Sequence, residues 1–468
     1  MRRMMVQYFE WYLRPEDKLW ESLKEDSRHL KSLGVSDVWM PPAYKGKKGI
    51  NDSGYGVYDL YDMGEFVQKG TVDTKYGSEA SYAEAVNELH QVGIGVIADI
   101  VLNHKLGADD KEKIQVESVS VDARHEVIES LEIEGWTKFT FDNRKGRYSK
   151  FNWNQSHFTG VDYDALRDKS GLYRFKGKSW AEDVDLELQN YDYLMGADVD
   201  FSNEEVIQEY KTWGSWYTDK YDLNGLRLDA VKHISFDFFG PWLSYLRENR
   251  ELFVVGEYWS SDLRALNNYL MMSDYAMHLF DVPLHFNLYD ASVLGEAYDL
   301  RDIFKNTLVQ NMGKHAVTFV DNHDTQVGQS LESYVKDWFR LSANAIILLR
   351  EFGTPCVFYN DYKNEDVQKL MKLRSHISND LYDRFDDPNV VGWSYVSDEG
   401  LCVLINNSND ALKKMFVGKH MAGQVFKDAL GSCSEEVLIS ELGIGIFPVK
   451  ARSVSVYTKG GHINESIS

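Results

Sequence analysis

Four short segments, far apart in the chain, each begin in an apolar run that is prone to form a β-strand and end in polar, ionisable side chains. They are Asp99–His104, Gly225–His233, Gly256–Trp259 and Phe319–Asp324. One such run alone is more often a strand followed by a helix cap. Four in order instead indicate an enzyme whose catalytic groups meet at the C-terminal ends of the strands of one barrel.

Three carboxylates in these segments are placed for acid–base chemistry: Asp229, Glu257 and Asp324. Hydrolysis of a glycosidic bond uses a carboxylate and a carboxylic acid, roughly 5–5.5 Å apart in retaining enzymes and roughly 6.5–9.5 Å apart in inverting ones. Because neighbouring strands are about 5 Å apart, adjacent strand ends favour the shorter separation. Asp229 and Glu257 therefore suit the roles of nucleophile and acid/base.

The neighbours of these carboxylates predict how each is charged. Arg227 lies two positions before Asp229, so both side chains face the same side of the strand. The fixed positive charge of Arg227 is expected to keep Asp229 ionised. Glu257 precedes Tyr258 and Trp259, and partial burial beside these rings is expected to raise its pKa, so that it can donate a proton.

Histidines and one tyrosine accompany the carboxylates. His104, His233 and His323 follow or end their strands, where imidazoles can donate hydrogen bonds to sugar hydroxyls. Tyr55, in the segment Asn51–Tyr58, could stack on a sugar ring. A lone histidine is more often structural, and turn packing explains Tyr55 alone equally well. The sugar-binding interpretation therefore depends on the neighbouring segments.

Apolar, strand-forming runs alternate with amphipathic stretches through most of the chain. The period changes from that of a strand to that of a helix in eight successive units. In the sixth unit the strand is expected at Tyr275–Phe280 and its helix at Leu300–Val309. Eight such units predict an α/β fold, a (β/α)₈ TIM barrel.

Two regions depart from this alternation. Residues 104–203 follow the third strand and are rich in aromatic side chains, and they predict an inserted domain of irregular β-structure because a structureless loop of this length is improbable. Residues 386–468 hold short β-like runs broken by Asn, Asp and Gly, which predict a C-terminal antiparallel β-sandwich. The barrel is then expected to comprise residues 1–103 and 204–385.

Composition limits the partners and the compartment. The net charge of −22 disfavours a nucleic-acid or anionic-membrane partner, because like charges repel. Three widely spaced cysteines, without metal-type spacing, indicate free thiols in a reducing compartment: Cys356, Cys402 and Cys433. Residues 1–10 lack the apolar core of a signal peptide, so a cytoplasmic location is expected. No apolar run reaches the length of a transmembrane helix.

The four segments resemble the four signature regions of the α-amylase family, glycoside hydrolase family 13. The resemblance covers nearly the whole chain and is strongest to bacterial liquefying and intracellular α-amylases. It is carried by four further motifs, Gly54–Tyr61, Tyr191–Asp200, Phe280–His285 and Val320–Gln326.

The resemblance implies a role for each matching residue. Asp229 matches the nucleophile, Glu257 the general acid/base, and Asp324 the third carboxylate, which binds and distorts the sugar in subsite −1. Lys232 and His233 match residues on the leaving-group side, and this pair favours action on α-1,4 rather than α-1,6 bonds. The substrate contacts implied in all are Tyr55, His104, Arg227, Lys232, His233, Trp259 and His323.

The resemblance also implies a calcium ion between the barrel and the inserted domain. The residues that match the ligand positions offer carboxylate, amide and backbone oxygens, and an oxygen-rich set of this kind suits Ca²⁺. Asp200 also lies near these positions. Liquefying enzymes often carry a further calcium–sodium–calcium cluster with two Asp ligands, and here the matching positions are Thr159 and Ala181. Because cation affinity depends on ligand charge, we expect one structural calcium and no such cluster. The matching calcium ligands are Asn103, Asp192, Asp198 and the backbone oxygen of His233.

These observations predict a monomeric, retaining endo-hydrolase of α-1,4-glucosidic bonds in starch, glycogen or maltodextrins, with no nucleic-acid or membrane partner. The expected cytoplasmic location favours glycogen or imported maltodextrins over external starch. One alternative is a transglycosylase of the same family, in which a sugar hydroxyl outcompetes water. Another is a non-catalytic carbohydrate-binding or partner protein. The complete set of catalytic groups argues against the latter, because a binding protein does not need an acid opposite a nucleophile.

Overall fold

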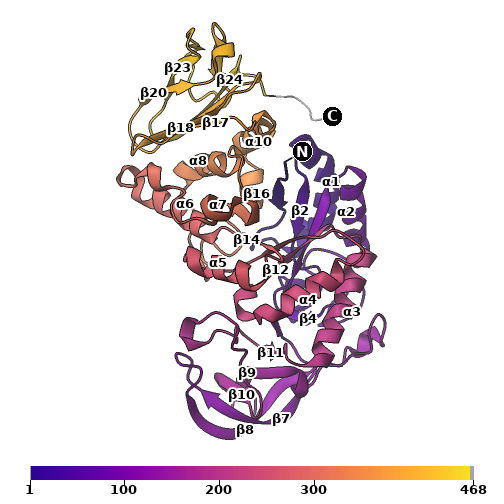
Figure 1. The fold of residues 1–468 in the computed structure, drawn as a ribbon. Helices are drawn as coiled ribbons and strands as arrows, with labels where there is room; N and C mark the ends of the chain where they lie inside the picture. The colour runs from indigo at the N-terminus through magenta and orange to yellow at the C-terminus, as the bar shows by residue number, and fades with distance from the viewer. Residues whose placement is uncertain (1, 464–468) are drawn as a thin grey trace.

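The computed structural model describes residues 2–463, and its central unit is a closed barrel of eight parallel strands (Figure 1). Each barrel strand is largely buried, and sheets covered on both faces are built from apolar runs of this kind. The predicted barrel fold is thereby confirmed. The strands are β1 (Met5–Gln7), β2 (Asp37–Met40), β5 (Gly95–Ile100), β12 (Gly225–Leu228), β13 (Phe253–Gly256), β14 (His278–Phe280), β15 (Ala316–Phe319) and β16 (Thr354–Phe358).

Helices alternate with the strands and pack on the outside of the barrel (Figure 1). In most of them the buried positions lie on one side, as the amphipathic periodicity predicts. The helices are α1 (Leu19–Ser32), α2 (Glu79–Gln91), α3 (Glu204–Lys220), α4 (Phe236–Leu246), α5 (Leu263–Met272), α6 (Val282–Leu294), α7 (Leu308–Met312), α8 (Asp337–Leu348), α9 (Tyr359–Tyr362) and α10 (Glu365–Leu373).

The helix predicted at Leu300–Val309 is wrong. The sixth strand is followed by α6, which begins at once because the Asp281 carboxylate accepts a hydrogen bond from the backbone N–H of Leu284 at 3.1 Å. Apolar side chains lie on several sides of α6, so it lacks the one-sided periodicity that marks an amphipathic helix. The predicted range instead holds a 3₁₀ turn at Leu300–Asp302 and the start of α7.

The segment after the third barrel strand forms one six-stranded sheet at one end of the molecule (Figure 1). Its strands lie in the spatial order β6–β11–β9–β10–β7–β8, and β7 and β8 form a long antiparallel hairpin. The strands are β6 (His104–Lys105), β7 (Asp110–Val119), β8 (Val127–Lys138), β9 (Phe158–Asp164), β10 (Lys169–Phe175) and β11 (Ala197–Val199).

Antiparallel sheets of six and two strands form the other end of the molecule (Figure 1). The larger sheet begins with β17, four residues before the barrel boundary predicted at residue 385. The smaller sheet pairs β20 with β23. The strands are β17 (Leu381–Arg384), β18 (Val390–Tyr395), β19 (Leu401–Asn406), β20 (Ala411–Phe416), β21 (Val425–Asp428), β22 (Val437–Leu438), β23 (Ile444–Val449) and β24 (Ser453–Lys459).

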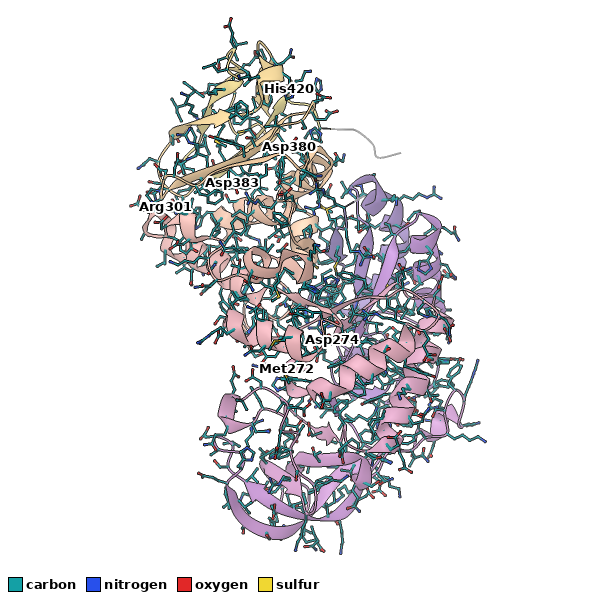
Figure 2. The ribbon with its side chains drawn as sticks, in the orientation of Figure 1. Met272, Asp274, Arg301, Asp380, Asp383 and His420 are labelled. Carbon is teal, nitrogen blue, oxygen red and sulfur yellow. The ribbon has the colours of Figure 1, made fainter. Side chains whose placement is uncertain are left out.

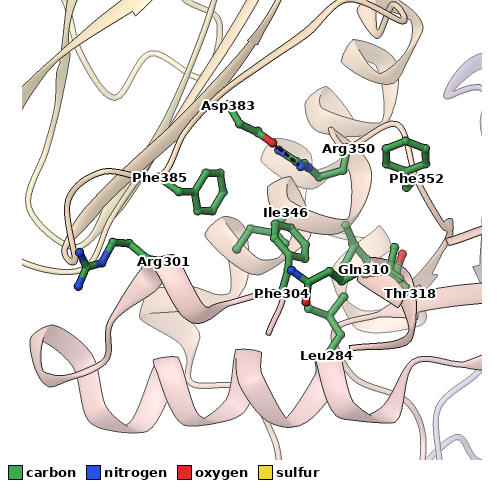
Figure 3. Close-up of a pocket in the computed structure, with 12 residues that line it drawn as sticks. Leu284, Arg301, Phe304, Gln310, Thr318, Ile346, Arg350, Phe352, Asp383 and Phe385 are labelled. Atoms are coloured by element: carbon green, nitrogen blue, oxygen red, sulfur yellow. Dashed lines mark hydrogen bonds and ion pairs between the residues drawn. The ribbon is translucent and has the colours of Figure 1, made fainter. Parts of the chain in front are cut away.

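Asp380 and Asp383 lie where the C-terminal sheet meets the barrel helices (Figure 2). The guanidinium of Arg350, just after α8, pairs with the carboxylate of Asp383 across a pocket of about 400 Å³ (Figure 3). Nearby, the indole N–H of Trp393 donates to the carbonyl of Leu349 at 2.8 Å. An ion pair and a buried hydrogen bond thus join the two units.

The remaining features concern the cysteines and the helices. All three cysteines are buried free thiols, in agreement with the expectation from their spacing. In residues 2–463, every helix is too short or too polar to cross a membrane.

Candidate active site

The four segments singled out in the sequence meet at the C-terminal end of the barrel strands. Asp229 directly follows β12, Glu257 directly follows β13, and Asp324 lies in the loop after β15. All three line a cleft of about 630 Å³, and residues of the inserted segment line it as well. Other lining residues include Trp11, Tyr55, His104, Glu187, Tyr191, Lys232, His233, Trp259 and Phe286.

One buried guanidinium, that of Arg227, contacts the carboxylates around it. Its Nη1 lies 2.6 Å from Oδ1 of Asp229, and its Nη2 lies 2.8 Å from Oε2 of Glu257. Oε2 of Glu257 also accepts a hydrogen bond from the backbone N–H of Ala230 at 3.2 Å. The two candidate catalytic carboxylates are therefore held on neighbouring nitrogens of one planar group.

Asp99 completes this cluster, and the sequence assigned it no role. Its Oδ1 lies 2.9 Å from Nη1 of Arg227, and its Oδ2 accepts hydrogen bonds from the Tyr55 hydroxyl at 2.7 Å and the Trp39 indole at 2.9 Å. In the pairing of β12 with β5, Asp99 is directly opposite Arg227. An Asp inside an otherwise apolar strand was the signal that could have identified it.

Burial and mutual charge control the protonation of the cluster. Burial raises the pKa of Asp229 and of Glu257, and the Arg227 guanidinium opposes the rise in both. Burial raises the pKa of Asp324 well above its ordinary value, and the charge of Glu257 raises it further. For Glu257 the direction is the one expected from sequence, whereas for Asp229 burial outweighs Arg227. Several carboxyl groups around one cation therefore favour a state in which at least one keeps a proton.

Stacked rings form one wall of the cleft beside Asp324. The rings of Tyr55 and His323 are 4.9 Å apart and 11° from parallel, and Trp11 stacks on the other rings at about 6 Å. Burial lowers the pKa of His323 far below its ordinary value, so its ring is neutral. Gln7 Nε2 lies 3.2 Å from Nδ1 of His323, which places the ring proton on Nε2, 3.2 Å from Oδ2 of Asp324. Sequence reasoning missed Gln7 and Trp11, which come from the first barrel unit.

The loop after β12 is tied to the inserted segment on the other side of the cleft. The ammonium of Lys232 donates to the carboxylate of Glu187 at 3.0 Å and to the carbonyl of Trp259 at 3.1 Å. Nδ1 of His233 lies 2.6 Å from the carbonyl oxygen of Tyr191. The sequence assigned no role to Glu187 or to Tyr191, although Tyr191 begins the motif Tyr191–Asp200.

His104 lies at the junction of barrel and inserted sheet. Its Nε2 is 2.9 Å from the carbonyl oxygen of Tyr55, and burial lowers its pKa to about 4, so the ring is neutral. In the pairing of β6 with β11, His104 is opposite Asp198, and the carbonyl of Asn103 accepts from the N–H of Val199 at 3.0 Å. The junction thus places the cleft next to the residues that resemble calcium ligands.

The side chains proposed as calcium ligands have the chemistry for a divalent cation. Burial raises the pKa of Asp192 to about 7, and the charges of Asp183 and Asp200 raise it further. Burial raises the pKa of Asp198 well above its ordinary value, and the charge of Asp192 raises it further. Within residues 2–463 no three His, Cys, Asp or Glu side chains are grouped to hold a metal. A cation here would therefore need amide and backbone oxygens beside the two carboxylates.

Uncharged donors and a lysine contact the acids of this region. The hydroxyl of Thr159 donates to the carboxylate of Asp198, and the backbone N–H of Ala181 donates to Oδ2 of Asp192 at 3.0 Å. The ammonium of Lys178 pairs with the carboxylate of Asp200. Asp200 is thus already neutralised by a side chain of the protein.

Known α-amylases and their family models match nearly the whole chain. The model of the α-amylase catalytic domain matches residues 21–386, and that of the α-amylase C-terminal domain matches residues 401–458. The chain is 45% identical to an α-amylase of Geobacillus stearothermophilus, over 97% of this chain and 86% of that protein. It is 39% identical to the cytoplasmic α-amylase of Escherichia coli (strain K12), over 97% and 98% of the two chains.

Solved structures agree at the level of the fold. A crystal structure of the α-amylase from Geobacillus thermoleovorans, complexed with acarbose, superposes with a TM-score of 0.62 over 98% of both chains at 17% identity. The α-amylase I of Eisenia fetida superposes with a TM-score of 0.66 over 97% of both chains at 14% identity. At these identities the likeness concerns the arrangement of the elements alone.

Proposed function

The chain belongs to the α-amylase family, and from that membership we propose that Asp229, Glu257 and Asp324 carry out its chemistry. The protein is a glycoside hydrolase that cleaves α-1,4-glucosidic bonds within α-glucans. We further propose that its substrates are starch, glycogen or maltodextrins. The observation that carries the residue assignment is the single guanidinium of Arg227, which contacts the carboxylates of both Asp229 and Glu257.

In the first step, Asp229 attacks the anomeric carbon while Glu257 gives its proton to the departing glycosidic oxygen. In the second, Glu257 takes a proton from water, which attacks the same carbon and releases the sugar from Asp229. The carboxylates of Asp229 and Glu257 contact neighbouring nitrogens of the one Arg227 guanidinium, which supports the short separation of a retaining enzyme. The raised pKa of Glu257 supports its role as the initial acid.

The other cleft residues bind and orient the glucan. Asp324 accepts hydrogen bonds from sugar hydroxyls, and the neutral ring of His323 donates to them from Nε2. The one ring proton of His104 is on Nε2, facing the Tyr55 carbonyl, so its Nδ1 can only accept from a sugar hydroxyl. The ring of Tyr55, which lines the cleft, supports a sugar ring. Lys232, His233 and Trp259 contact the sugars on the leaving-group side.

A product time course on soluble starch and maltoheptaose tests the function, with anomeric configuration followed by ¹H NMR. Early release of mixed oligosaccharides with the α-configuration is expected, because two displacements restore the configuration of the substrate. Longer chains without a net gain of reducing ends would contradict hydrolysis in favour of transglycosylation. No turnover would contradict the enzyme assignment and favour a binding protein.

We propose one structural calcium ion, held by Asn103, Asp192, Asp198 and the backbone oxygen of His233. Bound there, the ion would neutralise two buried carboxylates and join the inserted segment to the barrel. The two buried carboxylates support this site, because burial and the charge of Asp192 raise the pKa of Asp198 and a bound cation would offset both effects. The contacts made by Thr159, Ala181 and Lys178 support the absence of a calcium–sodium–calcium cluster.

Metal analysis is expected to find one calcium per chain, and a chelator is expected to lower Tm. Replacing Asp198 with Asn should abolish both the bound calcium and the effect of the chelator, because it removes half of the carboxylate charge of the proposed site. Asp200→Asn is the matched control and should keep the ion, since Asp200 is paired with Lys178. Three metal ions per chain, or calcium retained by Asp198→Asn, would contradict the proposal.

The remaining assignments are also proposals. The name of the Escherichia coli relative supports a cytoplasmic location, and we propose a monomer. We propose a barrel domain of residues 1–103 and 204–385, an inserted domain of residues 104–203 and a C-terminal domain of residues 386–468. The pairing of β17 with β18 supports moving the last boundary to Leu381.

A further inference from the structure

A third pocket, of about 400 Å³, lies at the N-terminal end of β1, the end of the strands opposite the catalytic carboxylates. The segment before β1 forms one side of it, and the end of α10 with the residues that follow forms another. Its lining combines apolar and cationic side chains, chiefly Met4, Met371, Ile377, Arg2 and Arg374.

Arg374 is the cationic group of this pocket that is buried, with 6% of its surface exposed. Its Nη1 donates to the carbonyls of Leu348 and Arg350, the latter at 3.2 Å, and so caps the end of α8. Its Nε is buried and has no hydrogen-bond partner in the described chain. A structural role in capping therefore accounts for one nitrogen of the guanidinium and leaves another unsatisfied.

The charge of Arg374 is also uncompensated. Burial lowers its pKa to about 10, and the nearby positive charge of Arg2 lowers it further. Within residues 2–463 no carboxylate forms an ion pair with either arginine, although the chain carries a net charge of −22. A buried cation beside a second cation is costly unless an anion is bound.

Arg2 approaches the same pocket from the N-terminal segment. Its guanidinium donates to Asn379 Oδ1 at 2.8 Å and to the carbonyls of Ser378 and Glu351, both at 3.4 Å. These neutral acceptors hold the side chain in place without neutralising its charge. Proteins bind phosphate dianions between two guanidinium groups that are held in place in this way.

The pocket between the barrel and the C-terminal sheet also contains two arginines, but their charges are paired (Figure 3). Its two arginines are already neutralised, since Arg350 pairs with Asp383 and Arg301 pairs with Asp299. That pocket has a similar volume but offers an anion no free charge. Unpaired cations thus distinguish the pocket at β1.

We propose that the pocket at the N-terminal end of β1 binds a phosphate group, as the free ion or as a small phosphate monoester, between Arg2 and Arg374. The phosphate oxygens accept hydrogen bonds from the guanidinium groups of Arg374 and Arg2, which both line the pocket. The apolar side chains of Met4, Met371 and Ile377 contact the carbon part of an ester. The site is independent of the catalytic cleft at the other end of the strands.

Calorimetric titration of the full-length protein tests this site, with inorganic phosphate, glycerol 3-phosphate and neutral glycerol as probes at constant ionic strength. Saturable binding of one phosphate group per chain is expected, and no binding of glycerol. Tighter binding of glycerol 3-phosphate would assign the pocket to a monoester, and tighter binding of inorganic phosphate to the free ion; both support the proposal.

Variants locate the binding. Arg2→Gln and Arg374→Gln are each expected to weaken Kd at least about tenfold, because each removes a charged hydrogen-bond donor. Arg2→Gln keeps the test decisive if Arg374→Gln unfolds through loss of the α8 cap. Arg14→Gln, at an exposed arginine paired with Asp17, is the matched control and should bind normally. Absence of saturable binding would overturn the proposal. An unchanged Kd in Arg2→Gln would also overturn it, because the bound phosphate would then be an adventitious ion only.

Discussion

Replacing Asp229 with Asn is expected to reduce kcat on maltoheptaose by about 10⁴–10⁶-fold, and Glu257→Gln by about 10³–10⁴-fold. The first change removes the nucleophile, and the second removes the proton that the leaving oxygen needs. Both substitutions preserve side-chain shape, so circular dichroism should show an intact fold. Asp274→Asn is the matched control, since Asp274 is exposed on the barrel flank (Figure 2) and should leave kcat unchanged.

Two further readouts separate the roles of these residues. An α-maltoside with an acidic leaving group needs no proton donor, so Glu257→Gln should cleave its first bond rapidly while Asp229→Asn should not. Wild-type activity should fall at high pH as Glu257 loses its proton and at low pH as Asp229 gains one, because the two groups must be protonated and ionised respectively. Glu257→Gln should lose the basic limb. A near-normal kcat in either variant, or a basic limb retained by Glu257→Gln, would refute the roles.

Replacing Arg227 with Met should shift the acid limb of the pH–rate profile to higher pH by about 1–2 units and lower kcat strongly. Arg227 lies within 3 Å of Asp99, Asp229 and Glu257, so its removal takes away the cation that most strongly opposes the rise of their pKa values. Asp229 then stays protonated to a higher pH, and the nucleophile is lost there. Tm should also fall, because buried carboxylates are left without a partner.

Arg144→Met is the matched control for this prediction. Arg144 is also buried and pairs with a buried carboxylate, that of Asp59, at 2.9 Å, but it does not line the cleft. Its loss should lower Tm in the same way and leave the pH–rate profile unchanged. An unshifted profile in Arg227→Met would show that the guanidinium does not control the ionisation of Asp229.

The sequence was sufficient to predict the barrel and the convergence of its strand ends. Local apolar periodicity marks each strand, and strand order alone brings the residues that follow β12 and β13 to the same edge. The prediction failed where the local pattern carries no periodic signal. Helix α6 is apolar on several sides, so the periodicity of the sequence favours the segment after it as the helix of this unit.

Other features of the site depend on contacts between distant parts of the chain. Gln7 reaches His323, and Lys232 reaches Glu187, through tertiary structure that no sequence motif encodes. The protonation of Asp229 was likewise predicted from its neighbour Arg227 alone. Burial has the larger effect on its pKa, and burial depends on the whole cleft.

The central claim is that Asp229 forms the covalent bond to the sugar and Glu257 supplies and removes protons. Treating Glu257→Gln with α-maltosyl fluoride tests it directly, because glycosylation needs no acid with this leaving group while hydrolysis of the intermediate lacks its base. Peptide mass spectrometry is expected to find a maltosyl adduct on Asp229. An adduct on Asp324 or Asp99, or products of inverted configuration without any adduct, would contradict the account.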